Sequence, residues 1–213
     1  MARPKVLVFD LDGTLIDSAP DLTQAVNALL GELGKPPLTE AAVRPMIGDG
    51  ARLLLARALA AAGADAPPPN VFDRFMQHYL AHLTDRTRPY PDVPPTLEAL
   101  KADGYAMGVC TNKPIEATRR VLEAFGLARF FGAVIGGDSL PQKKPEPEPL
   151  QATIAGLGGG SAVMIGDSAN DMLCARAAGV AGILIPSDYG TPAEHADLKL
   201  AHFAELPAAL ERL

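Results

Sequence analysis

The chain has 213 residues, 48% of them hydrophobic, which is enough for one large domain or for a domain with an insertion. A formal net charge of −6 without any run of Lys or Arg argues against nucleic acids and anionic membranes as partners, and favours small molecules. The sequence has no run of about 18 apolar residues and no apolar leader, so we expect a cytoplasmic protein.

Short apolar runs followed by turn residues recur along the chain and predict buried parallel strands. In chain order they are KVLVF (5–9), YAMGVC (105–110), AVIGG (133–137), AVMIG (162–166) and GILIP (182–186). Helical patterns separate most of them, and the segment 114–126 begins with a proline and ends with a glycine, as helices often do. This alternation predicts an α/β fold with a doubly wound, Rossmann-like parallel sheet.

The alternation is interrupted once, between residues 16 and 88, where the sequence shows amphipathic helices and no convincing strand. In the first helix, apolar residues recur at the spacing that lines one helix face. They are Leu22, Ala25, Val26, Leu29, Leu30 and Leu33. Further helices are expected over 50–62 and 71–85, because the prolines of the loop between them cannot continue a helix.

We therefore expect two domains: an α/β core of residues 1–15 and 89–213, and a helical cap of residues 16–88. An insertion after the first strand would lie over the carboxyl edge of the sheet, where ligands bind in this architecture. The alternative is that these helices pack flat against the sheet. The last segment, 201–213, predicts a closing helix without chemistry of its own.

Three of the expected strands are followed directly by side chains that can do chemistry. These are Asp10 and Asp12, then Thr111, Asn112 and Lys113, then Asp167 with Asp171 behind it. Since parallel strands in one sheet end at the same edge, these groups should meet. The segment 138–150 places Lys143 and Lys144 just before a helix, close enough to that edge to deliver an ammonium group.

Up to four carboxylates would share this edge with one or two lysines. Two like charges about 4 Å apart repel by roughly 4 kcal/mol at an effective dielectric constant near 20, so a fully ionised cluster needs compensation. Either some carboxylates hold protons or a divalent cation is bound. Oxygen ligands without His or Cys select a hard ion, and Mg²⁺ is the cofactor that we expect.

The cysteines and two of the histidines are also candidate metal ligands, but the sequence offers them no further ligands at a suitable spacing. Cys110 and Cys174 have no zinc-site spacing, which is typical of buried thiols in a reducing compartment. His78 and His82 are four residues apart on an expected helix, but the sequence offers neither the Glu of a HExxH motif nor a third ligand. We expect a surface or packing role for both histidines.

The remaining groups at the edge suit a phosphate ester. Thr111 offers a hydroxyl, Asn112 a backbone N–H, and a lysine a point charge. One carboxylate can attack phosphorus and form an aspartyl phosphate if a cation and the lysine offset the repulsion. A second carboxylate can protonate the departing alcohol and later accept a proton from the hydrolytic water.

Four motifs occur in order: DLDGT (10–14), TNK (111–113), KKPEPEP (143–149) and GDSAND (166–171). This set resembles the haloacid dehalogenase superfamily of phosphohydrolases, and the resemblance extends through the whole chain. Alone, the first motif would also fit a turn, and the last would also fit a helix N-cap. Together, they imply a phosphohydrolase with an inserted helical cap.

By this resemblance, Asp10 is the expected nucleophile and Asp12 the acid/base, whose backbone carbonyl also meets the metal. Asp167 would be a metal ligand beside Asp10 and Asp12, and Asp171 would orient metal-bound waters or Lys144 from outside.

Thr111, Asn112 and Lys144 would hold the phosphoryl group. Lys144 is chosen over Lys143 because it directly precedes Pro145 in a pattern like that of the family, which leaves Lys143 as a solvated neighbour.

Two segments, FDLDGTLIDSAPDL and VRPMIGDGARLLLARAL (43–59), are similar to the phosphoglycolate phosphatase group. A two-carbon phosphate with a carboxylate would need a second anion site from the cap. Gly48 and Gly50, which open a helix, offer N–H groups for it, and Arg52 is a further candidate. Asp49 would repel an anion unless it turns outward, and IGDG also fits a plain loop with an N-cap.

The leading hypothesis is a Mg²⁺-dependent phosphatase that converts 2-phosphoglycolate to glycolate and phosphate. A phosphosugar mutase, or a phosphatase for sugar phosphates, nucleotides or pyrophosphate, is the enzymatic alternative. Dehalogenation is disfavoured by Asp12, and phosphonate cleavage by the position of Lys35, the only lysine of the cap, between helices. A non-enzymatic phosphate-binding regulatory module should have lost part of the acidic set. Either a monomer or a homodimer is expected.

Overall fold

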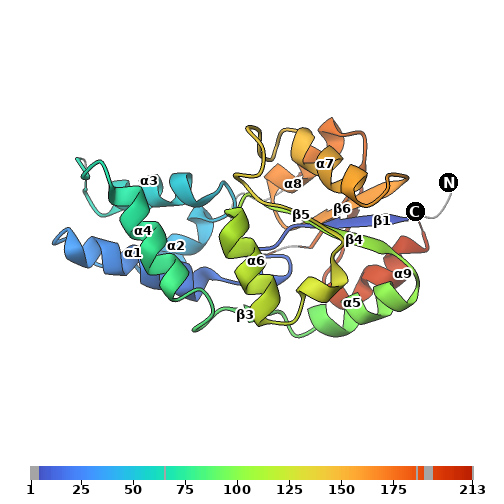
Figure 1. Ribbon diagram of the computed structural model, residues 1–213, viewed down its shortest axis with the longest axis horizontal. Coiled ribbons are helices and arrows are strands. Elements are labelled where there is room, and N and C mark those ends of the chain that lie inside the picture. The colour runs from blue at the N-terminus through green and yellow to red at the C-terminus, as the bar shows by residue number, and fades with distance from the viewer. Residues whose placement is uncertain (1–4, 65, 186, 190–193, 213) are drawn as a thin grey trace.

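The computed structural model describes residues 5–64, 66–185, 187–189 and 194–212. Its centre is a six-stranded sheet in the order β5-β4-β1-β6-β7-β8, and each hydrogen-bonded pair of strands is parallel (Figure 1). The strands are β1 (Val6–Phe9), β4 (Ala106–Cys110), β5 (Ala133–Ile135), β6 (Ala162–Gly166), β7 (Ala181–Leu184) and β8 (Leu198–Lys199). Because the chain extends the sheet from β1 first in one direction and then in the other, the predicted doubly wound α/β fold is confirmed.

Successive side chains of the central strand β1 point to opposite faces of the sheet. Leu7 and Phe9 belong to a core that includes α5, α6 and α9, whereas Val6 and Val8 pack in a cluster with α7 and α8. Figure 1 shows α7 and α8 on one face and α5 and α9 on the other. The helices are α5 (Val93–Ala102), α6 (Ile115–Ala124), α7 (Glu148–Gly156), α8 (Ala169–Ala177) and α9 (Leu206–Leu210). Burial on both faces explains why these strands read as continuous apolar runs.

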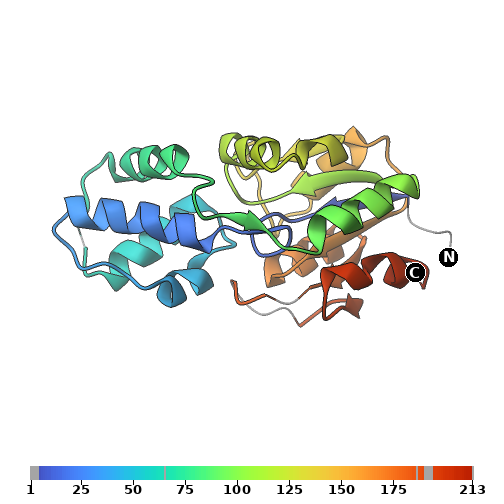
Figure 2. The same ribbon diagram turned by 90° about the horizontal axis from the view of Figure 1, so that it is seen from below.

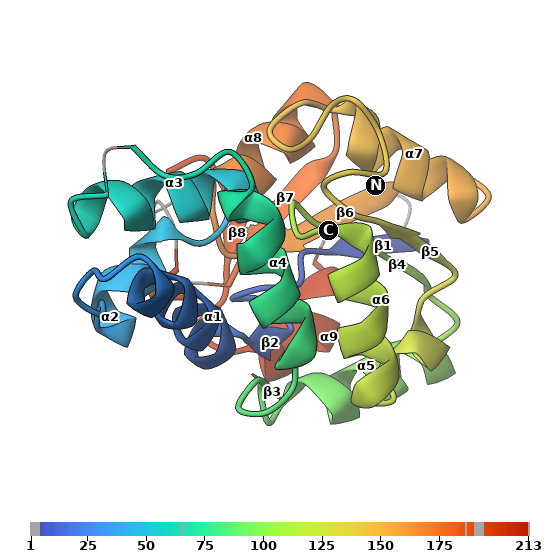
Figure 3. The ribbon, with the colours of Figure 1, turned by 60° about the vertical axis from the view of Figure 1, so that its left-hand side comes forward.

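The interruption in the alternation forms a group of helices beyond the carboxyl ends of the strands (Figures 1 and 2). These are α1 (Ala19–Glu32), α2 (Glu40–Val43), α3 (Ala51–Ala61) and α4 (Val71–Ala81), with a 3-10 turn at Arg44–Met46. Viewed from their side, they lie in front of the sheet and not along its faces (Figure 3). We call residues 19–81 the helical body. Its packing follows the predicted apolar stripe, since Leu22, Val26 and Leu29 of α1 are buried.

The absence of strands between residues 16 and 88 is the first wrong expectation. A two-residue strand, β2 (Ile16–Asp17), pairs antiparallel with β3 (Arg88–Pro89) where the chain leaves and re-enters the sheet region. A strand of two residues cannot show the alternation by which strands are recognised in a sequence. The same reason applies to β8, which the sequence did not predict.

The closing helix over 201–213 is shorter than expected. The structure has a 3-10 turn at Phe203–Glu205 and then α9, and residue 213 lies outside the described part of the chain. Residue 186, the end of the expected strand 182–186, also lies outside it. The expected helix over 71–85 ends earlier, at Ala81.

Two expectations about the whole chain concern membranes and cysteines. Among the helices that the structure describes, none combines the length and apolar character needed to span a bilayer. Cys110 and Cys174 are free and buried, as the sequence predicted.

Candidate active site

The carboxyl ends of three neighbouring strands position the first residues of the site. Asp10 follows β1, and its N–H still donates to the carbonyl of Ile165, at 2.9 Å. Thr111 follows β4, and its N–H donates to Ile135 at 3.0 Å, while Asp167 follows β6 directly. Because the ladder continues past the ends of β1 and β4, the backbone that carries Asp10 and Thr111 is fixed by the sheet.

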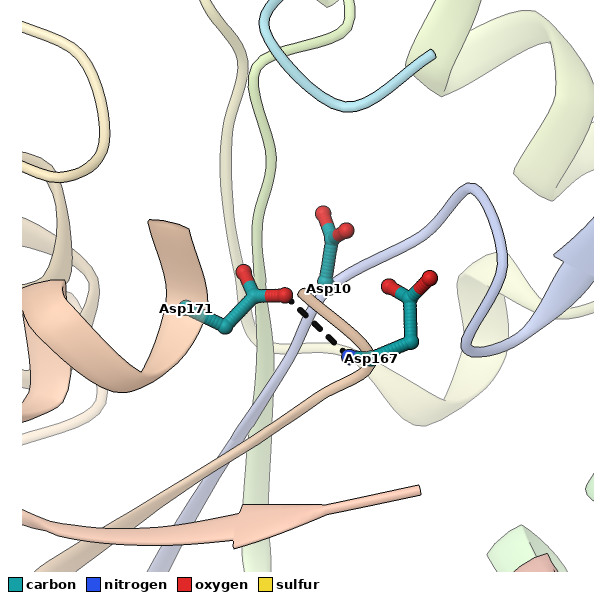
Figure 4. Close-up of side chains that lie close together, drawn as sticks. All are labelled: Asp10, Asp167 and Asp171. Atoms are coloured by element: carbon teal, nitrogen blue, oxygen red, sulfur yellow. Dashed lines mark hydrogen bonds between the residues drawn. The ribbon is translucent and has the colours of Figure 1, made fainter. Parts of the chain in front are cut away.

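Three carboxyl groups converge at this edge (Figure 4). One oxygen each from Asp10, Asp167 and Asp171 lies within 4.8 Å of the other two, and all three residues are buried. Burial raises the pKa of Asp10 to about 6, with Lys144 opposing the shift and Asp171 adding to it. Burial, then Asp171 and Asp10, raise the pKa of Asp167 well above its ordinary value. This shortage of positive charge and the all-oxygen donor set fit a divalent metal ion.

Lys144 supplies positive charge to two carboxylates of this cluster. Its Nζ lies 2.8 Å from Asp10 Oδ1 and 2.6 Å from Asp171 Oδ1. Burial alone would lower the pKa of Lys144, but the two carboxylates raise it well above its usual value. The lysine is therefore charged and aimed at the nucleophile candidate, as proposed for Lys144 over Lys143.

Asp171 is held at the start of α8, where it completes a capping box with Ser168. Its Oδ2 accepts from the Ser168 N–H at 3.0 Å and from the Ser168 hydroxyl at 2.7 Å. With its other oxygen on Lys144, this carboxylate is already committed to protein donors. The geometry suits the expected role of orienting Lys144 from outside the metal site.

Asp167 is fixed by two hydroxyl groups. Thr14 Oγ1 donates to Asp167 Oδ1 at 3.1 Å, and Ser187 Oγ donates to Oδ2. Gly13 has a φ of +87°, and a Cβ there would lie 2.2 Å from Asp167 Oδ2. The glycine of DLDGT is therefore required both for its backbone conformation and for the close approach of this carboxylate.

Asp12 is not part of this acidic cluster. Its Oδ1 accepts from the Ser18 hydroxyl at 2.6 Å and from Lys113 Nζ at 2.8 Å. Lys113 also donates to the hydroxyl of Tyr79, a buried residue of α4 in the helical body. Sequence reasoning gave no role to Lys113, Ser18 or Tyr79. The only signal was the basic third residue of TNK, and it does not reveal which carboxylate that residue meets.

A cavity with a volume of about 30 Å³ opens onto these groups. The core contributes Asp10, Asp12, Thr111 and Lys113 to its lining. The structure thus brings together the expected nucleophile, the expected acid/base and the hydroxyl expected to bind the phosphoryl group. The helical body contributes apolar residues and Tyr79 to the opposite wall.

The loop before α3 contacts the same cavity. Gly48 and Gly50 line it, and Gly50 is the N-cap residue of α3. The Asn112 amide donates to the carbonyl of Gly48 and to that of Lys144, both at 3.0 Å. Asn112 was expected to offer its backbone N–H to phosphate, whereas its side chain ties the loop to the Lys144 segment.

Asp49 points out of the cavity, as an anion site would require. Its carboxylate accepts from Asn170 at 2.6 Å and pairs with Arg57 at 2.6 Å. The Arg52 guanidinium lies over the Phe72 ring, 3.8 Å from its centroid, and Arg52 is not among the residues that line the cavity. Substrate binding by Arg52 stays a prediction that this geometry does not support.

Three other side chains considered from the sequence lie outside the cavity. Lys143 is exposed and donates to the backbone carbonyl of Asp49 at 2.9 Å. His78 contacts Glu32 and His82 contacts Asp85, both at 2.7 Å, so each histidine has an acidic partner on the surface. This arrangement agrees with the surface role expected for the two histidines.

Comparisons with known proteins agree with the architecture. A protein of Cereibacter sphaeroides named phosphoglycolate phosphatase is 44% identical over 97% of this chain and 98% of its own. The crystal structure of a predicted phosphoglycolate phosphatase from Haemophilus somnus has a TM-score of 0.91 and 34% identity, covering 98% of this chain and 99% of that one. CbbY from Rhodobacter sphaeroides, solved in complex with phosphate, has a TM-score of 0.84 and 25% identity, covering 98% and 99%.

The family model of haloacid dehalogenase-like hydrolases matches residues 7–185, which include all of β1 except Val6, the helical body and every carboxylate of the cluster. The chain therefore belongs to the haloacid dehalogenase-like hydrolase family.

Proposed function

We propose that this protein is a Mg²⁺-dependent phosphatase that hydrolyses 2-phosphoglycolate to glycolate and phosphate through an aspartyl phosphate on Asp10. The observation that carries the proposal is the setting of Asp10. Its carboxylate lies 2.8 Å from Lys144 Nζ, belongs to the acidic cluster, and lines the cavity together with Asp12. The relative from Cereibacter sphaeroides, which bears the name phosphoglycolate phosphatase, supports the substrate.

In the first proposed step, an Asp10 oxygen attacks phosphorus and the bond to the leaving oxygen breaks. Lys144 and the Thr111 hydroxyl stabilise the charge on the phosphoryl oxygens. Asp12 acts as the acid in this step: it gives a proton to the departing alkoxide and becomes the carboxylate that accepts from Ser18 and Lys113. In the second step a water attacks the acyl phosphate, and Asp12 takes up the proton that this water loses.

The metal in this proposal is Mg²⁺, held by Asp10, by Asp167 and by the backbone carbonyl of Asp12. Carboxylate and carbonyl oxygens are the ligands that this hard ion prefers. A bound divalent cation would supply positive charge that offsets the repulsion between the Asp10 carboxylate and a phosphate dianion. Thr14 and Ser187 orient Asp167 for this purpose.

The cap in this proposal is the segment 16–88, and the core comprises residues 1–15 and 89–213. Ile16 pairs with Pro89, so the chain leaves the core and returns to it at adjacent points. The cavity at Asp10 and Asp12 is small, with a volume of about 30 Å³. In this proposal the cap opens to admit substrate, and its closure then excludes bulk water. We keep the expected cytoplasmic location and a monomer or homodimer.

A panel of phosphate esters tests the proposal. Release of inorganic phosphate is measured from 2-phosphoglycolate, a hexose phosphate, a nucleoside monophosphate and pyrophosphate, with Mg²⁺ and with excess chelator. We expect the highest kcat/KM for 2-phosphoglycolate and loss of turnover in chelator. Equal rates with and without chelator would contradict the metal assignment, a preference for another ester would contradict the substrate, and an isomerised sugar phosphate would indicate a mutase.

A further inference from the structure

Lys113 is a buried cation whose contacts leave one donor for a ligand. Its ammonium group donates to Asp12 Oδ1 at 2.8 Å and to the Tyr79 hydroxyl. An ammonium group carries three N–H donors. Among the residues that the structure describes, these are the two acceptors of Lys113 Nζ, and Lys113 lines the cavity in front of Asp10.

The charge of Lys113 is secured by its neighbours. Burial alone would lower the pKa of Lys113, but the Asp12 carboxylate and the Tyr79 hydroxyl raise it above its ordinary value. Of the described residues that line this cavity, Lys113 is the only one with a cationic side chain, since Lys144 contacts Asp10 but is not part of the lining. A second anionic group of a ligand, away from the phosphoryl group at Asp10, would therefore meet Lys113 as the cationic side chain of the cavity wall.

The position of Lys113 matches the leaving group of a short substrate. When the phosphoryl group lies at Asp10, the acid/base Asp12 must contact the oxygen that bridges phosphorus and carbon. A group in direct contact with Asp12 then lies next to whatever is attached to that first carbon. In 2-phosphoglycolate, the attached group is a carboxylate.

The rest of the wall favours such a short ligand. Leu22, Ile47 and Leu54 line the cavity from the helical body. Apolar side chains would leave the hydroxyl groups of a sugar without hydrogen-bond partners, which a polar ligand tolerates poorly. They do not disfavour the single methylene of 2-phosphoglycolate.

We propose that Lys113, held in place by Tyr79, binds the substrate carboxylate and selects esters that carry a carboxylate on the carbon next to the bridging oxygen. This inference rests on the proposed function, because it places the phosphoryl group at Asp10 and the bridging oxygen at Asp12. It assigns recognition of the substrate carboxylate to the motif TNK of the core, whereas the sequence analysis expected the second anion site at Gly48 and Gly50 of the cap.

The test compares 2-phosphoglycolate with ethyl phosphate, which has the same two carbons without the carboxylate. We expect wild-type kcat/KM to favour 2-phosphoglycolate by at least about 100-fold, since a site built for a polar group rejects the analogue that lacks it. Lys113→Met should reduce this ratio at least about tenfold, and Lys113→Arg should restore part of it. Lys101→Met, at an exposed lysine that donates to the carbonyl of Arg129, is the matched control and should keep the ratio.

An equal fall in kcat/KM for both esters would overturn the proposal, because it would mean that Lys113 acts only through Asp12 and does not bind the carboxylate. If Lys113→Met does not fold, Tyr79→Phe replaces it and should lower the ratio as well, while an unchanged ratio would count against the proposal. Loss of the lysine also leaves the Asp12 charge uncompensated, which by itself repels a carboxylate. The comparison is therefore repeated with Asp12→Asn, where the effect of Lys113→Met on the preference should persist.

A binding measurement separates this inference from the proposed function. Calorimetric titration of Asp10→Asn protein with each ester reports affinity without turnover. Adding Lys113→Met should weaken binding of 2-phosphoglycolate at least about tenfold more than binding of ethyl phosphate. If the wild type releases no phosphate from either ester, the proposed function is wrong, and this titration still decides whether Lys113 binds the carboxylate.

Discussion

Lys144 Nζ lies 2.6 Å from Asp171 Oδ1, and both side chains are buried. The Asp171 carboxylate cannot rotate freely, because its second oxygen accepts from Ser168 in the capping box of α8. The helix therefore fixes the carboxylate, the carboxylate fixes the lysine, and the lysine reaches Asp10. The position of the Lys144 charge beside Asp10 therefore depends on the capped start of α8.

Substitutions of the adjacent residues Lys143 and Lys144 should lower activity to very different extents. Lys144→Met should lower kcat by about 10² to 10³, the usual loss when one donor to developing oxyanion charge is removed. Lys143→Met should change kcat by less than about fivefold, because an exposed polar contact contributes under about 1 kcal/mol. Steady-state kinetics on folded variants, checked by circular dichroism, makes the comparison. Similar losses in the two variants would show that the phosphate lysine is wrongly assigned.

Gly13→Ala should weaken metal binding. The new methyl group would lie 2.2 Å from Asp167 Oδ2, on a backbone with φ of +87°, so this carboxylate must move. Gly104→Ala is the matched control, since Gly104 has φ of +81° and nothing within 4 Å of the added Cβ. Calorimetric titration with Mg²⁺ should show reduced affinity only for Gly13→Ala. Equal affinities would mean that Asp167 is not a ligand in the position described.

Asn112→Ala should reduce both stability and activity. The variant loses two hydrogen bonds, to the carbonyls of Gly48 and Lys144, which should cost about 1–3 kcal/mol of unfolding free energy. Asn27 makes two comparable bonds with Leu38 inside the helical body, at 2.9 and 2.8 Å. Asn27→Ala should therefore lose stability and keep kcat. Urea unfolding and kinetics together test this, and normal kcat in Asn112→Ala would contradict the link to Lys144.

Stabilisation by metal should grow with pH. The pKa of Asp10 is raised by burial from its ordinary 3.8 to about 6, so the folded metal-free protein holds a proton that the unfolded chain has lost. Stability from this group is present below pH 4 and is lost as the pH rises through about 6. A divalent cation competes with that proton, so its stabilising effect increases over the same window.

The measurement is the shift in Tm caused by Mg²⁺ at several pH values between 4 and 7. We expect a small shift at the acid end and a larger one at neutral pH, with a much flatter dependence in Asp10→Asn. A shift that is the same at every pH in the wild type would rule out Asp10 as the titrating ligand.

Buried strands and the motifs that follow them were predictable from the sequence. Apolar runs such as 162–166 are buried on both faces, and the parallel sheet then brings Asp10, Thr111 and Asp167 to one edge. The pair β2 and β3 was not predictable, because a strand of two residues carries no periodicity and the paired residues Ile16 and Pro89 are 73 positions apart in the sequence.

The partner of Lys113 was beyond sequence reasoning for a similar reason. Tyr79 lies on a helix of the helical body, and no spacing within TNK reveals that its hydroxyl meets this lysine. Arg52 was a further candidate for the second anion site, but its guanidinium lies over the Phe72 ring, a contact that the linear pattern does not show. Side-chain direction at an interface between two segments depends on their packing, which short motifs do not encode.

The nucleophilic role of Asp10 is the centre of the account, and trapping of the phosphoenzyme tests it most directly. Protein is mixed with 2-phosphoglycolate labelled in its phosphoryl group, quenched in acid, and digested to find the labelled peptide. We predict label on the peptide that contains Asp10 in the wild type, none in Asp10→Asn, and persistent label in Asp12→Asn, which can form the intermediate but hydrolyses it slowly. Label on another peptide, or equal labelling of the Asp10→Asn and Asp12→Asn variants, would contradict the assignment of the two carboxylates.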